Sequence, residues 1–304
     1  MKKIYALLVI IFITFSCSTS DDFTSGGASL RQPVKPVTRL DPTKLARVIF
    51  YPGTTYERVW FFYPDGLLKK ITNPNGTILK DFIYDSHKNL ITSHTYSSNG
   101  NSTYIFTYDS SNHITSVNGR AVTYNAVTNQ YIFQYQPIFS NDPECPTCFD
   151  YADRTEITLN SDLLITDERT YYHSSDGDYS YGGMFAGYSD NNMAYVSGWT
   201  DPSGPSYSHD SKINPLKPAL IPVCRAMALA NGSYSEKFAI GEYNSINNVI
   251  RNDYGVGDPE SEEYIIEYNS NDLPFRTTHK SYYHQTLESI RISALYYYQG
   301  DVIP

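Results

Sequence analysis

The sequence is poor in cysteine, tryptophan and basic residues. Its 304 residues include 4 cysteines and 2 tryptophans, too few cysteines for a scaffold held together by disulfides. The 23 Lys and Arg residues stand against 32 Asp and Glu residues, which gives a net charge of −9. An acidic chain without clustered basic residues lacks the electrostatic surface that nucleic acids require. Nucleic acid is therefore not an expected partner.

Catalytic motifs and long apolar runs are also missing. The sequence contains no Gly-x-Ser-x-Gly elbow, no His-Glu-x-x-His pair and no glycine loop before Lys-Ser or Lys-Thr. The apolar run at 4–15 has twelve residues. A helix of that length rises about 18 Å, whereas the hydrocarbon core of a bilayer is about 30 Å thick. The run is too short for a transmembrane helix, and no second run approaches the required length.

The N-terminal residues have the pattern of an export signal. Two lysines supply a positive start, the apolar run follows, and the small Ser16 precedes Cys17. Segment 14–17, Thr-Phe-Ser-Cys, resembles the lipobox of bacterial lipoproteins, which implies a signal peptide at 1–16 and lipid attachment at Cys17. Segment 18–22, Ser-Thr-Ser-Asp-Asp, resembles the acidic surface-export signal of Bacteroidota-type lipoproteins. The alternative is an ordinary signal peptide with an incidental cysteine.

Residues 17–43 read as a lipidated, disordered tether. They are rich in Ser, Thr, Gly and Pro, and such a segment cannot bury enough apolar surface to become ordered. A coil of this length reaches about 25–30 Å. Two or more acyl chains would anchor the protein stably in the membrane. We therefore expect a lipid anchor in the outer membrane and a domain exposed on the cell surface.

The rest of the sequence alternates as strands do. In segment 103–108, Thr-Tyr-Ile-Phe-Thr-Tyr, the aromatic residues fall on one face and the other residues on the opposite face. Segments 131–136, 263–268 and 290–298 alternate in the same way. This period predicts antiparallel strands that are wetted on one side. Polar residues interrupt the apolar alternation, which favours a sheet outside the bilayer over a transmembrane barrel.

Turn clusters separate these strands, and several of them contain the Asn-Gly pair that supplies positive φ angles to tight hairpins. We therefore predict an all-β domain over 44–304. It should be an antiparallel hairpin meander forming one large twisted or rolled sheet, with a loop-rich middle section at about 137–233. One short helix is expected near 222–230, where Pro222 can occupy its first position, and it should pack as a plug against the sheet.

A repeat with a spacing of 21 to 25 residues recurs in the domain. Its unit is a strand ending in Tyr, then Asp or Asn, a Ser-rich turn, and an apolar residue that opens the next strand. Units lie at 84–90, 108–114, 243–249 and 268–273, and partial ones at 63–67 and 159–163. The tyrosine is expected to bury its ring and keep its hydroxyl at the wet edge, while the Asp or Asn bonds its own backbone.

This unit resembles a degenerate YD (RHS-type) repeat, as found in uncharacterised Bacteroidota-type surface lipoproteins. The resemblance covers about 56–136 and 234–299. Between them, segment 210–216 is similar to a short Lys-x-Asn-Pro segment of such lipoproteins, which implies one continuous domain. The resemblance implies long antiparallel sheets of hairpins, and most members have no established activity.

Cys145 and Cys148 have the spacing of a redox or metal pair. Their flanks read as loop, whereas a redox site needs a helix N-terminus beside the cysteine. Cys224 and His209 could complete a zinc site, although their spacing does not call for one. A structural disulfide between Cys145 and Cys148 is the favoured prediction, with unpaired thiols, a metal and redox catalysis as alternatives.

Two further groups have a plain interpretation and a functional one. The tyrosines of 171–188 are expected to pack in the core, although exposed rings could stack on a sugar or a protein partner. Segments 176–178 and 190–192 offer oxygen ligands for calcium, but turn residues explain both. We expect no cofactor and no metal.

These features predict a lipid-anchored cell-surface protein that acts as a non-catalytic binding or structural module. Its partners would be the membrane, through the acyl chains, and a glycan or protein ligand. The alternative is a hydrolase of surface glycans. Its acid and base would lie on separate strands, and such a pair cannot be recognised in a sequence.

Overall fold

The structure is a computed structural model. It describes residues 40–98, 100–134, 151–173, 179–198, 204–230, 245–254 and 258–303. The chain divides into two units, at 1–39 and 40–304, and only the second contains described residues. The expected signal peptide and Cys17 lie outside the described residues, as do the tether up to residue 39 and the Cys145–Cys148 pair.

The described part of the second unit contains an 18-stranded antiparallel sheet and one helix, α1 (Lys217–Ala230). The strands are β1 (Leu45–Phe50), β2 (Arg58–Phe62), β3 (Leu68–Thr72), β4 (Ile78–Tyr84), β5 (Leu90–Thr95), β6 (Ser102–Tyr108), β7 (Ile114–Val117), β8 (Arg120–Asn125), β9 (Gln130–Gln134), β10 (Tyr151–Leu159), β11 (Ile165–His173), β12 (Tyr179–Ser189), β13 (Asn192–Gly198), β14 (Ser206–Ile213), β15 (Asn247–Asp253), β16 (Glu260–Tyr268), β17 (Pro274–Tyr283) and β18 (Thr286–Tyr298).

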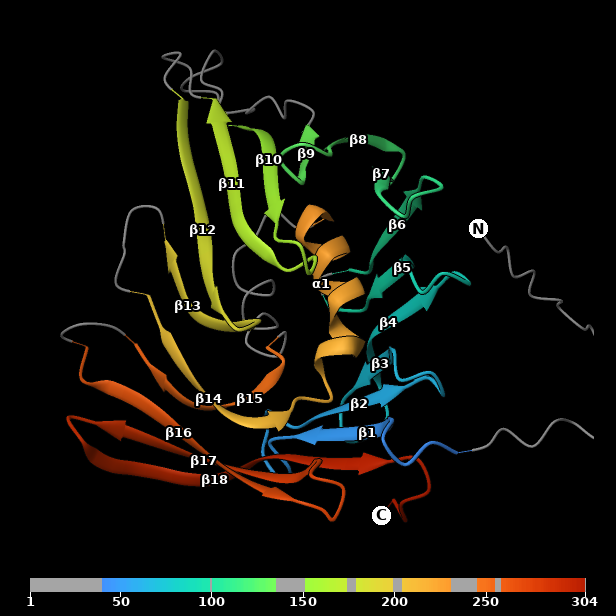
Figure 1. Ribbon diagram of the computed structural model, residues 1–304. Helices are drawn as coiled ribbons and strands as arrows, with labels where there is room; N and C mark the ends of the chain where they lie inside the picture. The colour runs from blue at the N-terminus through green and yellow to red at the C-terminus, as the bar shows by residue number, and fades with distance from the viewer. Residues whose placement is uncertain are drawn as a thin grey trace, which may run out of the picture. The chain divides into compact units, whose positions relative to one another are not determined.

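The strands form a closed barrel. Each strand pairs with the next along the chain. In addition, β18 returns to pair with β1, where Tyr298 faces Leu45 and Ala294 faces Phe50 (Figure 1). The all-β meander is confirmed, but the expected rolled sheet is closed. Alternation along a strand specifies which side chains face inward, whereas closure also depends on strand number and stagger.

The predicted faces of β6 and β9 agree with the barrel, whereas the alternation predicted for segment 290–298 does not hold, because Ile290 is 60% exposed and Ser293 is buried beside Ala294. In β6, Phe106 is 2% exposed while its neighbour Ile105 is 52% exposed. Tyr131 and Phe133 of β9 likewise point into the core. Apolar and aromatic residues of this kind fill the interior.

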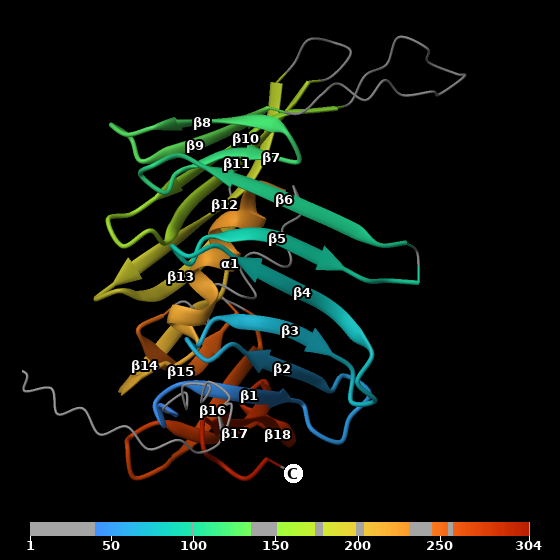
Figure 2. The ribbon, with the colours of Figure 1, turned by 90° about the vertical axis from the view of Figure 1, so that its right-hand side faces the viewer.

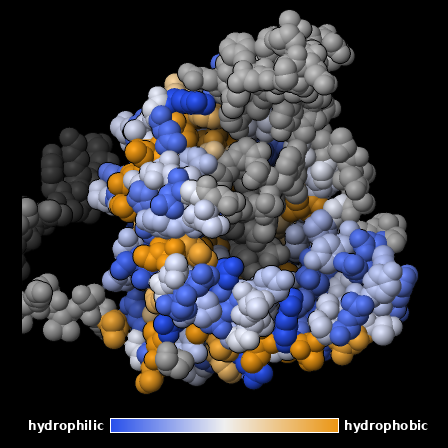
Figure 3. Space-filling model, turned by 180° about the vertical axis from the view of Figure 1, so that it is seen from behind, coloured by the Kyte–Doolittle hydropathy of each residue, from blue (hydrophilic) through white to orange (hydrophobic). Residues whose placement is uncertain are grey.

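The outer face carries many polar side chains. On β16 and β17, for example, Glu263 and Lys280 form an ion pair at 3.1 Å. Figure 3 shows hydrophilic residues spread over one side of the molecule, with hydrophobic residues in patches and in a row along the lower edge. Exposed apolar residues on β16–β18 include Ile265, Phe275 and Ile290.

Helix α1 lies inside the barrel (Figures 1 and 2). It contacts β5, β7 and β10, and Leu220, Ala226 and Leu229 on it are fully buried. The expected plug is therefore present, but it begins five residues earlier than predicted, because Pro222 lies within the helix rather than at its start. Burial of the first turn in the core offsets the hydrogen bond that proline cannot donate. No helix in the described ranges combines the length and apolarity needed to cross a membrane.

The middle section at 137–233 differs from the expectation of a loop-rich segment. Its described residues form β10 to β14 and α1. The strands were missed because their inward faces are partly polar, with Thr155, Glu168 and Thr170 all buried. Period-two apolar alternation, the main strand signal, is weak in such segments.

The repeat turns share one geometry. Asp85 Oδ1 accepts hydrogen bonds from the backbone N–H groups of His87 and Asn89, at 2.8 and 2.9 Å. Asp109, Asn160 and Asn269 each accept the same pair of bonds two and four residues on. The residue three positions after the Asp or Asn has positive φ, such as 67° at Lys88. The expected role of the Asp or Asn is confirmed.

The repeat tyrosines do more than expected. Two of their hydroxyls do not stay at the wet edge: Tyr84 donates to the carbonyl of Leu68 and Tyr108 to that of Leu90, both at 2.8 Å. Two tyrosines outside the repeat units, Tyr188 and Tyr298, bond the carbonyls of Ile165 and Pro274 in the same manner. Every acceptor opens the strand that follows a repeat turn, where a β-bulge shifts the register. Each tyrosine therefore ties one turn to a neighbouring turn.

Candidate functional site

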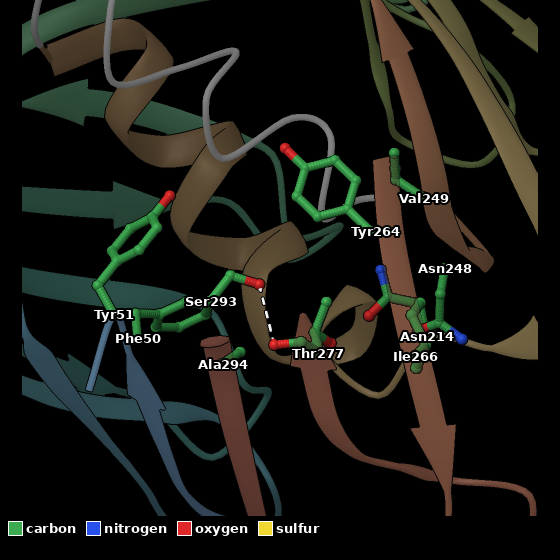
Figure 4. Close-up of a pocket in the computed structure, with 10 residues that line it drawn as sticks. All are labelled: Phe50, Tyr51, Asn214, Asn248, Val249, Tyr264, Ile266, Thr277, Ser293 and Ala294. Atoms are coloured by element: carbon green, nitrogen blue, oxygen red, sulfur yellow. Dashed lines mark hydrogen bonds between the residues drawn. The ribbon is translucent and has the colours of Figure 1, made fainter. Parts of the chain in front are cut away.

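A small pocket of about 50 Å³ is lined by the strands β15–β18, the end of β1 and the segment before α1 (Figure 4). Phe50 and Tyr51 stand on one side of it and Tyr264 on another, with Thr277 and Ser293 between them. The remaining lining residues are Asn214, Asn248, Val249, Ile266 and Ala294. The pocket therefore combines aromatic rings with amides and hydroxyls.

A β-bulge shapes one wall of this pocket. Thr277 faces Ala294, but Thr278 faces Ile292, so Ser293 is an extra residue on β18. As a result Ser293 and Ala294 are both buried, although neighbouring strand residues usually point to opposite faces. Ser293 donates from Oγ to the Thr277 carbonyl at 3.2 Å. The bulge thereby places a hydroxyl and a methyl group on the same wall.

The Lys-x-Asn-Pro segment positions the two amides. Asn214 accepts a hydrogen bond at Oδ1 from the backbone of Leu216 and donates from Nδ2 to the Ser245 carbonyl. Asn248 donates from Nδ2 to the carbonyls of Lys212 and Ile213, at 3.3 and 3.4 Å. The segment between β14 and α1 is thus fixed against the start of β15, which agrees with the expected continuity of the domain.

A buried polar network lies beside the pocket on β15, β16 and β17. Nε2 of His279 lies 3.2 Å from Oε1 of Glu262. Glu262 Oε2 accepts a hydrogen bond from the Tyr264 hydroxyl at 2.7 Å and one from Asn252 Nδ2 at 3.4 Å. The rings of Tyr264 and His279 are 5.2 Å apart. Tyr264 therefore belongs to both the network and the pocket lining.

The network holds Glu262 as a carboxylate. Burial by itself raises the pKa of Glu262, but the contact with His279 and the hydrogen bond from Tyr264 outweigh burial and bring the pKa to about 2. The other described carboxyl groups with a shifted pKa, at Asp41, Asp85, Asp109, Asp253 and Glu263, are shifted down as well.

Three buried side chains around this network have polar atoms without hydrogen bonds. They are Oδ1 of Asn252, Oγ1 of Thr277 and both ring nitrogens of His279. These residues are 4%, 6% and 4% exposed. Leaving a buried polar atom unpaired costs about 1–3 kcal/mol, so these atoms on β15 and β17 are candidates for contact with a polar ligand.

A second cleft lies where several repeat turns meet the segment before α1. Its volume is about 530 Å³, within the range of ligand pockets. Lys44, Asp65 and Lys88 contribute charge, and Leu45, Leu67, Ile213, Pro215, Pro218 and Leu273 contribute apolar surface.

Few of the candidate site residues predicted from the sequence lie in the pocket of Figure 4 or in the network beside it. Cys17, Cys145 and Cys148 lie outside the described residues, so the disulfide remains a prediction. Cys224 is buried in α1, and His209 Nε2 lies 3.0 Å from the Ser245 hydroxyl. Among the residues that the structure describes, no group of three or more His, Cys, Asp and Glu side chains could hold a metal.

The structure describes part of the tyrosine-rich segment 171–188 and one of the two segments considered for calcium. Tyr188 packs against the core, and its hydroxyl bonds the backbone. Segment 176–178 lies outside the described residues. Asp190 and Asn191 have φ angles of 51° and 61°, which is typical of a tight hairpin turn.

Sequence reasoning missed the network of Asn252, Glu262, Thr277 and His279. One signal was present: Glu262 shares the inward face of its strand with Tyr264 and Ile266, where an apolar residue is usual. The partners come from other strands, and only the register of β15, β16 and β17 brings them together.

Comparison with known proteins gives only distant matches. No protein-family model and no curated protein matches the sequence. Among solved structures, a porin-like protein from Bacteroides uniformis ATCC 8492 matches with a TM-score of 0.37 and 9% identity, over 85% of this chain and 98% of that chain. A porin-like protein from Bacteroides vulgatus ATCC 8482 matches with a TM-score of 0.30 and 9% identity, over 84% of this chain and 99% of that chain.

Proposed function

We propose that this protein is a lipid-anchored barrel of the outer-membrane surface that acts as a non-catalytic binding module. The observation that carries the proposal is the pocket beside three buried polar side chains with unpaired atoms, Asn252, Thr277 and His279. Thr277 lines the pocket, and an unpaired hydroxyl in the wall favours a ligand that supplies the missing partner. The repeated Asx turns support the interpretation of the sheet as an array of YD-type hairpins.

The pKa of Glu262 argues against this residue as the general acid of a hydrolase. A glycosidase needs a carboxylic acid whose pKa is raised so that it holds a proton at neutral pH. The pKa of Glu262 is about 2, so it carries no proton to give to a leaving group.

The proposed location of the protein rests on Cys17 and on the outer face of the barrel. Ion pairs such as Glu263 with Lys280 and Arg276 with Glu267 lie on that face, and charged side chains are costly against lipid. A barrel with this surface is better placed outside the bilayer, so the acyl chains at Cys17 would supply the membrane affinity.

The anchor is tested by Cys17→Ser, with Ser20→Ala as a control that leaves the cysteine in place. The first variant should accumulate unprocessed, or leave the membrane fraction after an alkaline carbonate wash, and should take up no radiolabelled fatty acid. The control should behave as the wild type. If Cys17→Ser still fractionated as a lipidated membrane protein, the proposed anchor would be wrong.

Binding and hydrolysis are separated by incubating the mature, full-length protein in detergent with a panel of surface glycans. Retention of a glycan without any new reducing end supports the binding module. Released sugar supports the hydrolase and overturns the proposal. Failure to retain any glycan or protein ligand would also count against a binding role.

A further inference from the structure

We infer that the pocket of Figure 4 takes an uncharged, hydroxyl-rich ligand, one edge of a sugar ring or a polyol, which bonds the hydroxyl of Thr277 in the pocket wall. This inference rests on the proposed binding function and adds the class of ligand. It follows from which polar atoms at the site are already paired and which are not.

The charged group beside the pocket, the Glu262 carboxylate, already has hydrogen-bond partners. Glu262 accepts from the Tyr264 hydroxyl and from Asn252 Nδ2, and the His279 ring stands 3.2 Å from its other oxygen. A ligand cation would have to displace these groups from the carboxylate. The network thus disfavours an amine or a metal ion as the occupant.

The unpaired atoms ask for hydroxyl groups. Asn252 Oδ1 can only accept a hydrogen bond, Thr277 Oγ1 can donate or accept, and His279 Nδ1 does either according to its tautomer. Of these residues only Thr277 lines the pocket. A ligand hydroxyl donates and accepts at once, so it can meet the Thr277 hydroxyl in either role, whereas an apolar group would leave that hydroxyl unpaired.

The rest of the lining fits the same class of ligand. Phe50, Tyr51 and Tyr264 present rings on two sides of the pocket, and aromatic rings pack against the C–H faces of sugars through apolar contact. The space of about 50 Å³ corresponds to roughly four water-sized groups, at about 10–15 Å³ each. That space suits about two hydroxyl-bearing carbons at the edge of a ligand rather than a long chain.

Thr277 is the residue on which to test this inference. It lines the pocket, and its hydroxyl has no hydrogen bond. Thr277→Val preserves shape and removes only the hydroxyl. Thr170→Val is the matched control, because Thr170 is also buried inside the barrel but its hydroxyl lies 3.0 Å from that of Thr155.

The experiment measures binding of glycerol, xylose and glucose to the full-length protein by ligand-observed NMR, beside the charged analogues glucosamine and glucuronate. We expect the neutral compounds to bind, and Thr277→Val to weaken them about tenfold. Without ligand, Thr277→Val should melt at the wild-type temperature or higher, since an unpaired group has been removed. Thr170→Val should melt lower and bind normally.

Two more variants control the result. Thr277→Ser keeps a hydroxyl and should retain binding. Lys88→Ala alters the larger cleft at the repeat turns and should leave binding unchanged, so a loss there would place the ligand in the wrong site.

Other outcomes overturn the inference. If none of the neutral compounds binds, and Thr277→Val melts lower as Thr170→Val does, the unpaired atoms hold ordered water only. If only glucosamine or glucuronate binds, and Thr277→Val weakens it, the ligand class is wrong while the binding function stands. Turnover of a sugar would instead refute the proposed function itself.

Discussion

The tyrosine hydroxyls that join neighbouring repeat turns should contribute measurably to stability. Tyr298 is the sharpest case, because it is 2% exposed and its hydroxyl donates to the Pro274 carbonyl at 2.9 Å in a buried setting. Tyr298→Phe removes the donor and leaves the carbonyl buried without it. We expect the free energy of unfolding to fall by about 1–3 kcal/mol, and the melting temperature by a few degrees at about 2–4 °C per kcal/mol.

The assay is urea denaturation followed by far-ultraviolet circular dichroism, with the midpoint and the slope fitted separately. Tyr56→Phe is the control, because Tyr56 is 69% exposed and a surface change of this kind usually stays within about 0.5 kcal/mol. Tyr84→Phe and Tyr108→Phe should fall between the two, since both residues are only partly buried. If Tyr298→Phe were as stable as Tyr56→Phe, the hydroxyl bonds would not be structural.

Three further predictions concern pH and the core. Burial raises the pKa of tyrosines such as Tyr108 and Tyr298. Their contribution to the free energy of unfolding is therefore complete below pH about 10 and falls above it by about 1.4 kcal/mol per pH unit for each tyrosine. Tyrosinate absorbance that rises gradually in the folded state would contradict this prediction. The pKa of Glu262 is lowered to about 2, so its contribution of about 3 kcal/mol to the free energy of unfolding is present above pH about 4.5 and is lost as the pH falls towards 2. Glu262→Gln should flatten the acid side of a profile of melting temperature against pH. An unchanged profile would refute the pairing of Glu262 with His279 and Tyr264. Leu220→Ala, at a fully buried position of α1, should lower the free energy of unfolding by about 2–5 kcal/mol. Ile213→Ala, at a residue that is 64% exposed, should lower it little in the same denaturation assay. Equal losses would refute the packing of α1 in the core.

Local patterns in the sequence were reliable where the physics is local. The inward face of β6 could be assigned from segment 103–108, because alternation follows from the pleat of any strand. The Asx turns at Asp85 and Asp109 were equally predictable, since the side chain bonds backbone only two and four residues away. Pro222 misled the start of α1, because its local preference for a first turn was weaker than burial of the residues before it.

The candidate site was beyond the reach of the sequence. Glu262 and His279 are seventeen positions apart and carry no motif, and their contact depends on the register of β16 against β17. A shift of one residue in that register would turn one of them outward. The sequence indicated the site only through Glu262, a polar residue on the inward face of a strand that otherwise carries aromatic and apolar residues.

By itself the sequence determined which residues of β6 and β9 face the core, where the repeat turns lie, and that the described domain is an antiparallel meander, because each depends on neighbours along the chain. The tertiary structure alone decided that β18 closes onto β1, that Tyr84 and Tyr108 bond the backbone of adjacent strands, and that Asn252 and His279 meet at Glu262. Those features join residues far apart in the chain, and only the stagger and closure of the whole barrel set their distances.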